Sequence, residues 1–276
     1  MKKASTSPLK VCIALIHYKN NQERFKYIWP KLNLLKKELS SDYDVSVLDI
    51  VDQPQVIPQK TLVTMFRKFT LWKFNRDWIS YKKQKRRNIV IDILILLRRL
   101  VLAYLNRVSE NRRTTIDSFV TSKHIKAWEE LLEKKANYLI VFEDDAVFTE
   151  VSVSTIKLFL RGLKKYHDRP IYLDFAGGCS QEVLKISNLE YKSDKFRKYY
   201  QKPVTNTACC YLTNDKTAGL FLENILRYPW LRLIPIDWLM NKLFILTVSK
   251  NKYFCFHASP HIFKHGSDSG DYKSWL

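Results

Sequence analysis

The sequence predicts an α/β fold in which a mixed sheet is flanked by helices and carries a basic helical insertion. Short apolar runs typical of buried strands alternate with helical patterns along most of the chain, and no Pro-rich or Ser-rich linker divides it. The 276 residues are 46% hydrophobic, which is enough to fill a sizeable core. We therefore expect a single domain over residues 1–276, with the insertion at residues 60–115.

The first elements predict a strand, a helix and a second strand. Residues 10–17 form an apolar run typical of a buried strand, and Asn20 or Asn21 can cap a helix that continues to Leu39. Residues 45–51 supply the next strand. This order favours a βαβ unit with parallel strands, which is the usual opening of a nucleotide-binding α/β domain.

The same alternation returns after the insertion. Helices are predicted at residues 122–135, 154–166 and 214–226, and strands at residues 138–142, 171–175 and 253–257. Ligands of such sheets bind beyond the carboxyl ends of the strands. Polar residues that directly follow a strand are therefore the first candidates for a site.

Much of the positive charge lies in the insertion. Residues 60–113 hold fifteen Lys and Arg against three acidic residues, which is +12 of the net charge of +20. The apolar stretch at residues 89–105 carries three charges, which argues against a membrane-spanning helix. We expect a surface helix that docks on an anionic membrane, and a core helix with solvated neighbours is the alternative. The predicted docking cations are Lys82, Lys83, Lys85, Arg86 and Arg87.

Targeting and cysteine patterns predict a cytoplasmic protein, peripheral on the inner face of the cytoplasmic membrane. The apolar run at residues 11–16 is too short for a secretory signal. The five cysteines are odd in number and contain no CxxC pair, which fits neither a disulfide framework nor a zinc site. We interpret them as reduced core residues.

Three adjacent carboxylates, Glu143, Asp144 and Asp145, directly follow the predicted strand at residues 138–142. Adjacent carboxylates repel one another, and a divalent cation such as Mg²⁺ or Mn²⁺ removes the repulsion while leaving positions for donor phosphates. A solvated turn that caps the next helix is the alternative for such a triplet. Its position at the end of a buried strand favours the metal site.

Residues 122–147, in which His124 and Trp128 precede the strand that ends in Glu-Asp-Asp, resemble glycosyltransferase family 25, the lipooligosaccharide galactosyltransferase type. The chain departs from the family pattern at Asn206 and Thr207, where a Gly is usual, and in its basic insertion. The resemblance continues, in the same order along the chain, at Arg24, residues 207–218, Pro235-Ile236-Asp237, residues 259–261 and residues 265–267.

The resemblance implies a GT-A-type, Rossmann-like fold, a UDP-sugar donor, a Mn²⁺-type ion and inversion at the anomeric carbon. On this basis we expect an enzyme that moves a hexose such as galactose to a lipopolysaccharide, O-antigen or capsule precursor, whose acceptor is a glycan or a lipid-linked glycan. A basic nucleic-acid-binding protein and a non-catalytic membrane-associated scaffold are the alternatives. The absence of a helix-turn-helix, zinc-finger or RNP signature argues against the first, and the three retained acids argue against the second.

The candidate site residues fall into groups by expected role. Asp237 is the candidate general base, and a cap for a helix over residues 238–243 is its alternative role. The alternative role of His124 is a helix cap, and the alternative for His265 is a place in a mobile C-terminal tail. The candidate ion ligands are Glu143, Asp145 and His265; the donor-binding residues are Arg24, His124, Asp144, Lys264 and Gly266; the acceptor-side residues are Asp174, Gly177 and Gly178, where the alternative is a tight turn.

Overall fold

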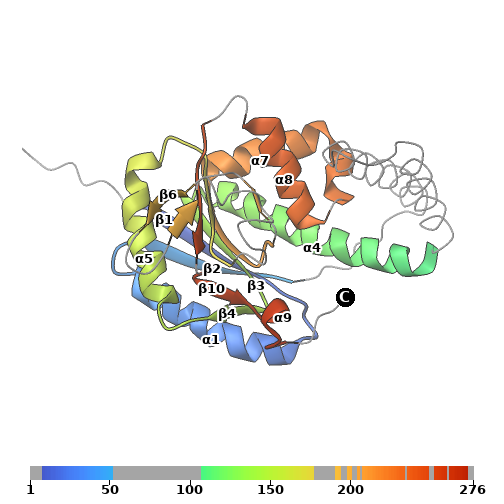
Figure 1. Ribbon diagram of the computed structural model, residues 1–276, viewed down its shortest axis with the longest axis horizontal. Helices are drawn as coiled ribbons and strands as arrows, with labels where there is room; N and C mark the ends of the chain where they lie inside the picture. Colours follow the sequence, from blue (N-terminus) through green and yellow to red (C-terminus); the bar gives the residue numbers. More distant parts are fainter. Residues whose placement is uncertain are drawn as a thin grey trace, which may run out of the picture.

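The computed structural model places most of the chain, coloured in sequence order in Figure 1. It describes residues 8–51, 107–176, 190–193, 198–200, 204–205, 207–233, 235–248, 252–259 and 261–272. The basic insertion up to residue 106, with the five predicted docking cations, lies outside the described residues. The predictions made for that segment therefore stay predictions.

Within these ranges the centre of the fold is an eight-stranded mixed sheet in the order β2-β1-β3-β8-β5-β9-β7-β6. β1 is parallel to β2 and β3, and β5 is parallel to β9, whereas β8 is antiparallel to β3 and β5. The predicted mixed α/β sheet is confirmed. The strands are β1 Lys10–Ile16, β2 Asp44–Ile50, β3 Tyr138–Glu143, β5 Ile171–Asp174, β6 Glu190–Ser193, β7 Lys198–Tyr200, β8 Cys210–Asn214 and β9 Phe254–Ser259.

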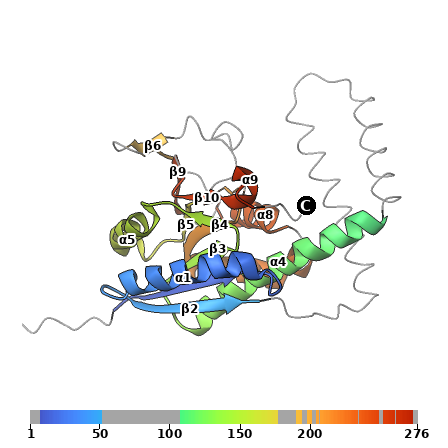
Figure 2. The same ribbon diagram turned by 90° about the horizontal axis from the view of Figure 1, so that it is seen from below.

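Helices cover both faces of the sheet, as the two views in Figures 1 and 2 show. α1 (Gln22–Leu39) and α5 (Ser152–Leu163) pack on one face, and α4 (Arg107–Glu133), α7 (Asp215–Arg227) and α8 (Ile236–Thr247) pack on the other. None of the helices in the described ranges is both long and apolar enough to cross a bilayer. The 3₁₀ helices are η1 Lys164–Tyr166 and η2 Pro229–Leu233.

A smaller sheet brings the end of the chain back to the end of β3. It pairs β4 (Ala146–Phe148) with β10 (Phe263–His265) in antiparallel register, and the short helix α9 (Gly266–Ser269) follows β10. Phe263 is fully buried and makes edge contacts with Phe142 and Phe148, with ring centres 5.2 Å and 4.9 Å away. This aromatic contact anchors the C-terminal segment against the acidic cluster.

Strand β1 shows why the central strands are apolar without interruption. Its side chains alternate between the two helical layers, so Ile13 and Leu15 join the core under α1 while Ala14 and Ile16 join the core that contains Trp128 of α4. Both faces of the strand are buried, so a polar residue would fit on neither side. The continuous apolar run is the sequence signal of this position.

Two predicted helix starts are wrong. α4 begins at Arg107 rather than near Ser122, so His124 lies inside the helix and does not cap it. The residues from 107 to 118 are largely polar, so apolar periodicity does not indicate the first turns of this helix. α8 begins at Ile236 after Pro235, so Asp237 lies in its first turn and is not an N-cap for a later start. Proline suits a helix entry because its φ angle is preset.

We expect Asn214→Ala to lower the free energy of unfolding by about 3 kcal/mol, because the buried side chain caps α7 and also bridges two elements. Its Oδ1 atom accepts from the Thr217 and Ile171 amides at 3.1 Å and 3.0 Å, and its Nδ2 atom donates to the Arg169 carbonyl at 2.8 Å. Urea denaturation measures the loss. Asn224→Ala on the same helix is the matched control, since Asn224 bonds only to the carbonyl one turn earlier; equal losses in both variants would contradict the bridging role.

Candidate functional site

The carboxyl end of β3 brings the three predicted acids to one edge of the sheet. Because β8 runs antiparallel to β3, its start lies against the end of β3, and Phe142 pairs with Cys210. The Glu143 amide donates to the Cys209 carbonyl at 2.8 Å. The chain then turns into β4, which pairs with β10. The acids therefore lie between the start of β8 and the C-terminal segment.

Glu143 is paired with His124 of α4. The His124 Nε2 atom lies 3.0 Å from Glu143 Oε1, and its Nδ1 atom lies 3.0 Å from the Tyr211 hydroxyl. Trp128 donates from Nε1 to the same hydroxyl oxygen at 3.0 Å. The lowered pKa of Glu143 favours its ionised carboxylate, which can only accept, so His124 Nε2–H donates to it; in the neutral imidazole Nδ1 then accepts the proton of the Tyr211 hydroxyl. A buried relay thus fixes both the imidazole tautomer and the direction of the Glu143 carboxylate.

Asp144 is paired with Arg24 of α1. Arg24 Nη1 donates to Asp144 Oδ1 at 2.8 Å, and both residues are buried. The guanidinium also lies 4.9 Å from the centre of the Tyr272 ring, within range of a cation–π contact. The Asn21 side chain accepts from the Arg24 amide at 3.4 Å and caps α1, so the helix start positions the arginine. Arg24 and Asp144, which were both predicted to bind the donor, are therefore bonded to each other, and Arg24 neutralises the charge of Asp144.

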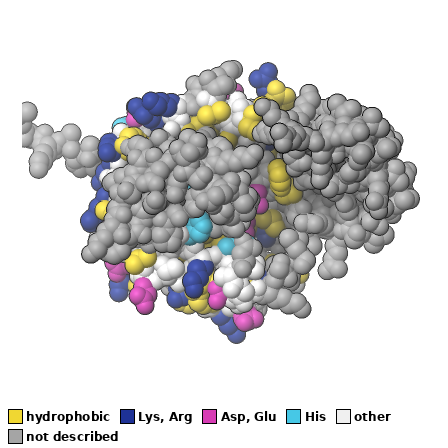
Figure 3. Space-filling view, viewed as in Figure 1, with side chains coloured by type: hydrophobic (Ala, Val, Ile, Leu, Met, Phe, Trp, Pro, Cys, Tyr) yellow, Lys and Arg dark blue, Asp and Glu magenta, His cyan; other side chains and the backbone are white. Residues whose placement is uncertain are grey.

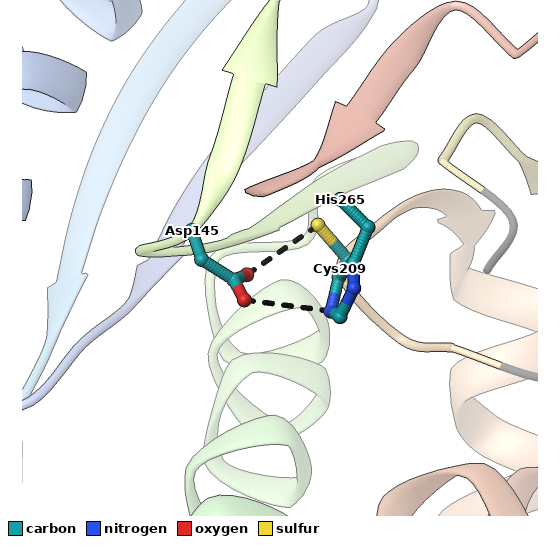
Figure 4. A group of neighbouring side chains, drawn as sticks. All are labelled: Asp145, Cys209 and His265. Atoms are coloured by element: carbon teal, nitrogen blue, oxygen red, sulfur yellow. Dashed lines mark hydrogen bonds and ion pairs between the residues drawn. The ribbon is translucent and has the colours of Figure 1, made fainter. Parts of the chain in front are cut away.

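Asp145 has the most crowded surroundings of the three acids. Ser267 Oγ donates to Asp145 Oδ2 at 2.6 Å, and His265 Nε2 lies 3.4 Å from the same oxygen. The Cys209 thiol donates to Oδ1 at 3.6 Å. Figure 4 shows the thiol and the imidazole both directed at the carboxylate, one from the entry to β8 and the other from β10. One carboxylate, one imidazole and one thiol thus converge on a small volume.

The neighbouring acids Glu143 and Asp145 have pKa values shifted in opposite directions. Burial raises the pKa of Glu143, but the hydrogen bond from His124 and the surrounding positive charge outweigh it, so its pKa is lowered overall. Burial, and then repulsion from Glu143, raise the pKa of Asp145 in spite of His265 and Ser267. Asp145 is thus the carboxylate with the greater need for a cation.

Gly266 holds the C-terminal segment close to Asp145. Its amide donates to the Asp145 carbonyl at 2.8 Å, and its carbonyl accepts from the Tyr272 amide at 3.0 Å. A Cβ atom here would lie 2.7 Å from the Asp145 carbonyl oxygen and 2.5 Å from Tyr272 Cδ2. Only glycine fits this approach. The Gly266 amide, predicted to bind donor phosphate, is already bonded within the protein.

A second buried polar group lies farther along the same face of the sheet. Asp174 ends β5, and its Oδ2 atom lies 3.3 Å from His257 Nδ1 of β9 and 3.5 Å from the Tyr172 hydroxyl. Burial, then Asp174, raise the pKa of Tyr172 well above its usual value, and Asp237 adds to this. The half-buried Asp237 therefore acts on the Tyr172 hydroxyl from the first turn of α8.

Register links this second group to the first. Tyr211 of β8 pairs with Val141 of β3 and with Asp174 of β5, and Asp174 pairs with His257 of β9. Paired residues share a face, so the polar residues form one row across the carboxyl ends of β3 and β5. Sequence analysis predicted Asp174 in this position but could not place it in the row.

The remaining predicted residues are less central or are not described. Lys264 is exposed on β10, where it pairs with Val147. Gly177 and Gly178, predicted on the acceptor side, lie outside the described residues. On the face drawn in Figure 3, histidine side chains (cyan) reach the surface near the middle of the molecule. His265 is partly exposed, with 16% of its side chain accessible.

Sequence analysis missed Cys209 and Ser267, which contact Asp145, and Tyr211, which contacts His124 beside Glu143. Cys209 was interpreted as a core thiol, and it is buried, yet it points at Asp145. The feature that could have identified Cys209 is its position in the chain. It directly precedes β8, and β8 runs antiparallel to β3, the strand that ends in the acids. Tyr211 carried no signal beyond β propensity. Ser267 lay beside the predicted His265 in a segment without periodicity.

The three ligand atoms of Asp145, Cys209 and His265 lie within 4.8 Å of one another. Together they offer oxygen, sulfur and nitrogen donors, a set that suits a transition metal better than Mg²⁺. The structure thus combines two of the predicted ion ligands, Asp145 and His265, with the unpredicted Cys209. Glu143, the third predicted ligand, is bonded to His124 and reaches Asp145 through its charge.

A comparison with known protein families matches the segment of the chain that contains the acidic triplet. Residues 121–240 match the model of glycosyltransferase family 25 (LPS biosynthesis protein). The resemblance predicted from the sequence is confirmed over this segment, and with it the predicted enzyme class, a glycosyltransferase. The match contains the relay of His124 and Trp128, the acidic triplet, β8 and Asp237, whereas Arg24 and His265 lie outside it.

Two further comparisons add little. None of the curated proteins is significantly similar to the chain. Among solved structures, the crystal structure of a glycosyltransferase involved in the glycosylation of the major capsid of PBCV-1 is similar, with 9% sequence identity, 92% of each chain covered and a TM-score of 0.39.

We expect Gly266→Ala to destabilise the protein by about 2–4 kcal/mol, because the new Cβ would clash with the Asp145 backbone and Tyr272 and lift the C-terminal segment from the site. Gly219→Ala is the control. Its Cβ would meet nothing within 4 Å inside α7, so this change should instead add up to about 1 kcal/mol through helix propensity. Thermal denaturation of both variants tests the close approach, and a Gly266→Ala protein as stable as wild type would contradict it.

Proposed function

We propose that this glycosyltransferase moves a hexose from a UDP-linked or related nucleotide sugar to a lipopolysaccharide, O-antigen or capsule precursor, with inversion and with assistance from a divalent metal. The observation that carries the proposal is the convergence of Asp145, which lies inside the segment that matches the family model, and His265, which lies C-terminal to that segment, at the carboxyl end of β3. Ligands of α/β sheets bind at this edge. The family description supports the surface-glycan acceptor.

The residues around Asp145 would hold the ion. Asp145 and His265 supply an oxygen and a nitrogen 3.4 Å apart, and the negative charge of Glu143 lies near enough to raise the pKa of Asp145, second only to burial as a cause. A bound divalent ion would neutralise charge on the departing nucleotide diphosphate, which is Lewis-acid assistance to a leaving group. Mn²⁺ fits this donor set better than Mg²⁺ because one donor is an imidazole.

The other two acids support the site without being free ligands. Arg24 neutralises Asp144, and this pair together with the Gly266 contact fixes the backbone of the triplet between α1 and α9. The relay from Trp128 through Tyr211 and His124 orients Glu143. In this proposal both pairs act as positioning groups that hold the reactive edge rigid before a donor arrives.

Asp237 is the proposed general base. It lies in the first turn of α8 and acts on the Tyr172 hydroxyl at the same edge of the sheet, beside Asp174. In an inverting displacement one carboxylate takes the proton of the acceptor hydroxyl as that oxygen attacks the anomeric carbon. Asp237 is half-buried, so its carboxylate is not withdrawn into the core.

Membrane docking through the basic insertion and a cytoplasmic location on the inner membrane face complete the proposal. Their support is the sequence alone: a run of cations followed by an apolar stretch attracts an anionic bilayer. Such docking would bring a lipid-linked acceptor to the enzyme.

We expect Asp145→Asn to abolish sugar transfer while the fold is kept. Nucleoside diphosphate release from a panel of donors, with and without Mn²⁺, measures the activity. Stability in the presence of a chelator gives an independent result. Because the folded-state pKa of Asp145 is raised, ionisation of this group removes stability as the pH rises through that pKa, starting from about pH 4. The asparagine variant lacks this loss, so its stability relative to wild type should improve with rising pH; Mn²⁺-dependent turnover near the wild-type level would contradict the metal role.

We expect Asp237→Asn to lower turnover by about a hundredfold or more, since the amide keeps the shape of the carboxylate and loses its basicity. Affinity for the nucleotide, measured by calorimetry, should stay close to that of wild type. Asp215→Asn, an acid in the first turn of α7, is the control for helix-dipole effects. If both variants lose only thermal stability and keep their turnover, Asp237 is a helix-stabilising residue and the base lies elsewhere.

A further inference from the structure

We propose that Cys209 is a metal ligand, so that Cys209, Asp145 and His265 form a sulfur, oxygen and nitrogen site that binds Zn²⁺ or Co²⁺ in preference to Mg²⁺. The proposal shares Asp145 and His265 with the proposed function and deepens its metal assignment. It goes further by adding a thiolate to the site and by ranking the ions. Nothing in the five-cysteine pattern of the sequence indicated such a site.

The separations of the donor atoms match those of a tetrahedral site. Bonds of about 2.3 Å to sulfur and about 2.1 Å to nitrogen or oxygen, at tetrahedral angles, place sulfur about 3.6 Å and nitrogen about 3.4 Å from the oxygen. Cys209 Sγ lies 3.6 Å from Asp145 Oδ1, and His265 Nε2 lies 3.4 Å from Asp145 Oδ2. The two contacts use different carboxylate oxygens, so one ion would be held either by both oxygens or by one of them after the carboxylate turns. All three ligand atoms lie within 4.8 Å of one another, so side-chain rotation alone can bring them onto one ion.

The backbone around the three donors is fixed by contacts other than those between the donors themselves. The Cys209 carbonyl accepts from the Glu143 amide at 2.8 Å, and the Asp145 carbonyl accepts from the Gly266 amide at 2.8 Å. Ser267 Oγ donates to Asp145 Oδ2 and orients the carboxylate. Such outer contacts reduce the conformational cost of assembling a metal site.

Charge favours an ion at this position. In the metal-free protein the Cys209 thiol donates its proton to Asp145 Oδ1 at 3.6 Å, and Glu143 places a second negative charge near Asp145. A divalent cation between the sulfur and the carboxylates would offset that negative charge and replace the thiol proton, which is released to solvent. The resulting thiolate selects borderline and soft ions, because Mg²⁺ prefers oxygen ligands and octahedral geometry.

The site also has a way in. Cys209 is fully buried and Asp145 nearly so, whereas 16% of the His265 side chain is exposed. The imidazole is therefore the donor nearest to solvent, and a fourth position on that side can be taken by water or a donor phosphate oxygen. Among the described residues this is the group of three His, Cys, Asp or Glu side chains whose ligand atoms come this close.

Titration of the reduced full-length protein with Co²⁺ tests the proposal. We expect one equivalent to produce a sulfur-to-cobalt charge-transfer band and intense visible bands typical of a four-coordinate site, with release of about one proton. Zn²⁺ should remove these bands at stoichiometric amounts, and Mg²⁺ should not at large excess. Cys209→Ser should lose the charge-transfer band and bind Co²⁺ at least about tenfold more weakly. Cys255→Ser is the matched control, because Cys255 is also a buried cysteine of the central sheet but belongs to no such group within the described part of the chain.

The outcomes separate this proposal from the proposed function. The charge-transfer band without sugar transfer from the proposed donors supports the metal site and contradicts the proposed donor and acceptor. Sugar transfer without a sulfur band in the wild-type protein, or removal of the bands by Mg²⁺ as readily as by Zn²⁺, overturns the proposal. If Cys209→Ser fails to fold, His265→Gln provides the second variant: it should keep the sulfur band but weaken Co²⁺ binding, and unchanged affinity would overturn the site.

Discussion

Three carboxylates on consecutive residues at the end of a buried strand repel one another, so each needs its own source of positive charge or hydrogen bonds. Here the sources come from three distant parts of the chain. Glu143 takes His124 of α4, Asp144 takes Arg24 of α1, and Asp145 takes the segment that follows β10. The contacts that offset this repulsion also hold both helical layers and the C-terminal segment to one edge of the sheet.

The sequence predicted the parts of the fold that depend on local pattern. Buried strands such as β1 and β3 appear as uninterrupted apolar runs, and the first strand, helix and strand follow as predicted. The start of α4 was missed because its first turns are polar, and the strands β6 and β7, the last two at one side of the sheet, were missed because they are short and lack alternation. Residues 177 and 178, and the basic insertion up to residue 106, lie outside the described residues, whereas residues 107–115 belong to α4.

The sequence predicted where the site lies in the fold, but not which side chain contacts each of the three acids. The acids at the end of β3 and the histidine in the C-terminal segment were found from residue type and place. Which side chain pairs with which acid depends on contacts across 120 residues for Arg24 with Asp144 and 122 residues for Ser267 with Asp145. Cys209 illustrates the limit most clearly: only the antiparallel register of β8 on β3 turns an apparent core thiol toward Asp145.

The pairing is also unequal, and the pKa values of Glu143 and Asp145 are shifted in opposite directions. Glu143 and Asp144 have close hydrogen-bonding cationic or imidazole partners, at 3.0 Å and 2.8 Å, whereas Asp145 has a serine, a thiol and an imidazole at 3.4 Å. Opposed pKa shifts in adjacent carboxylates are a feature of functional sites, because a stable fold gains nothing from them. A cation bound by Asp145 and Cys209, as proposed, would bind only the folded protein, so ligand binding and stability would be coupled at this point. An ion at this position would therefore rigidify the same edge of the sheet at which the donor and the acceptor would meet.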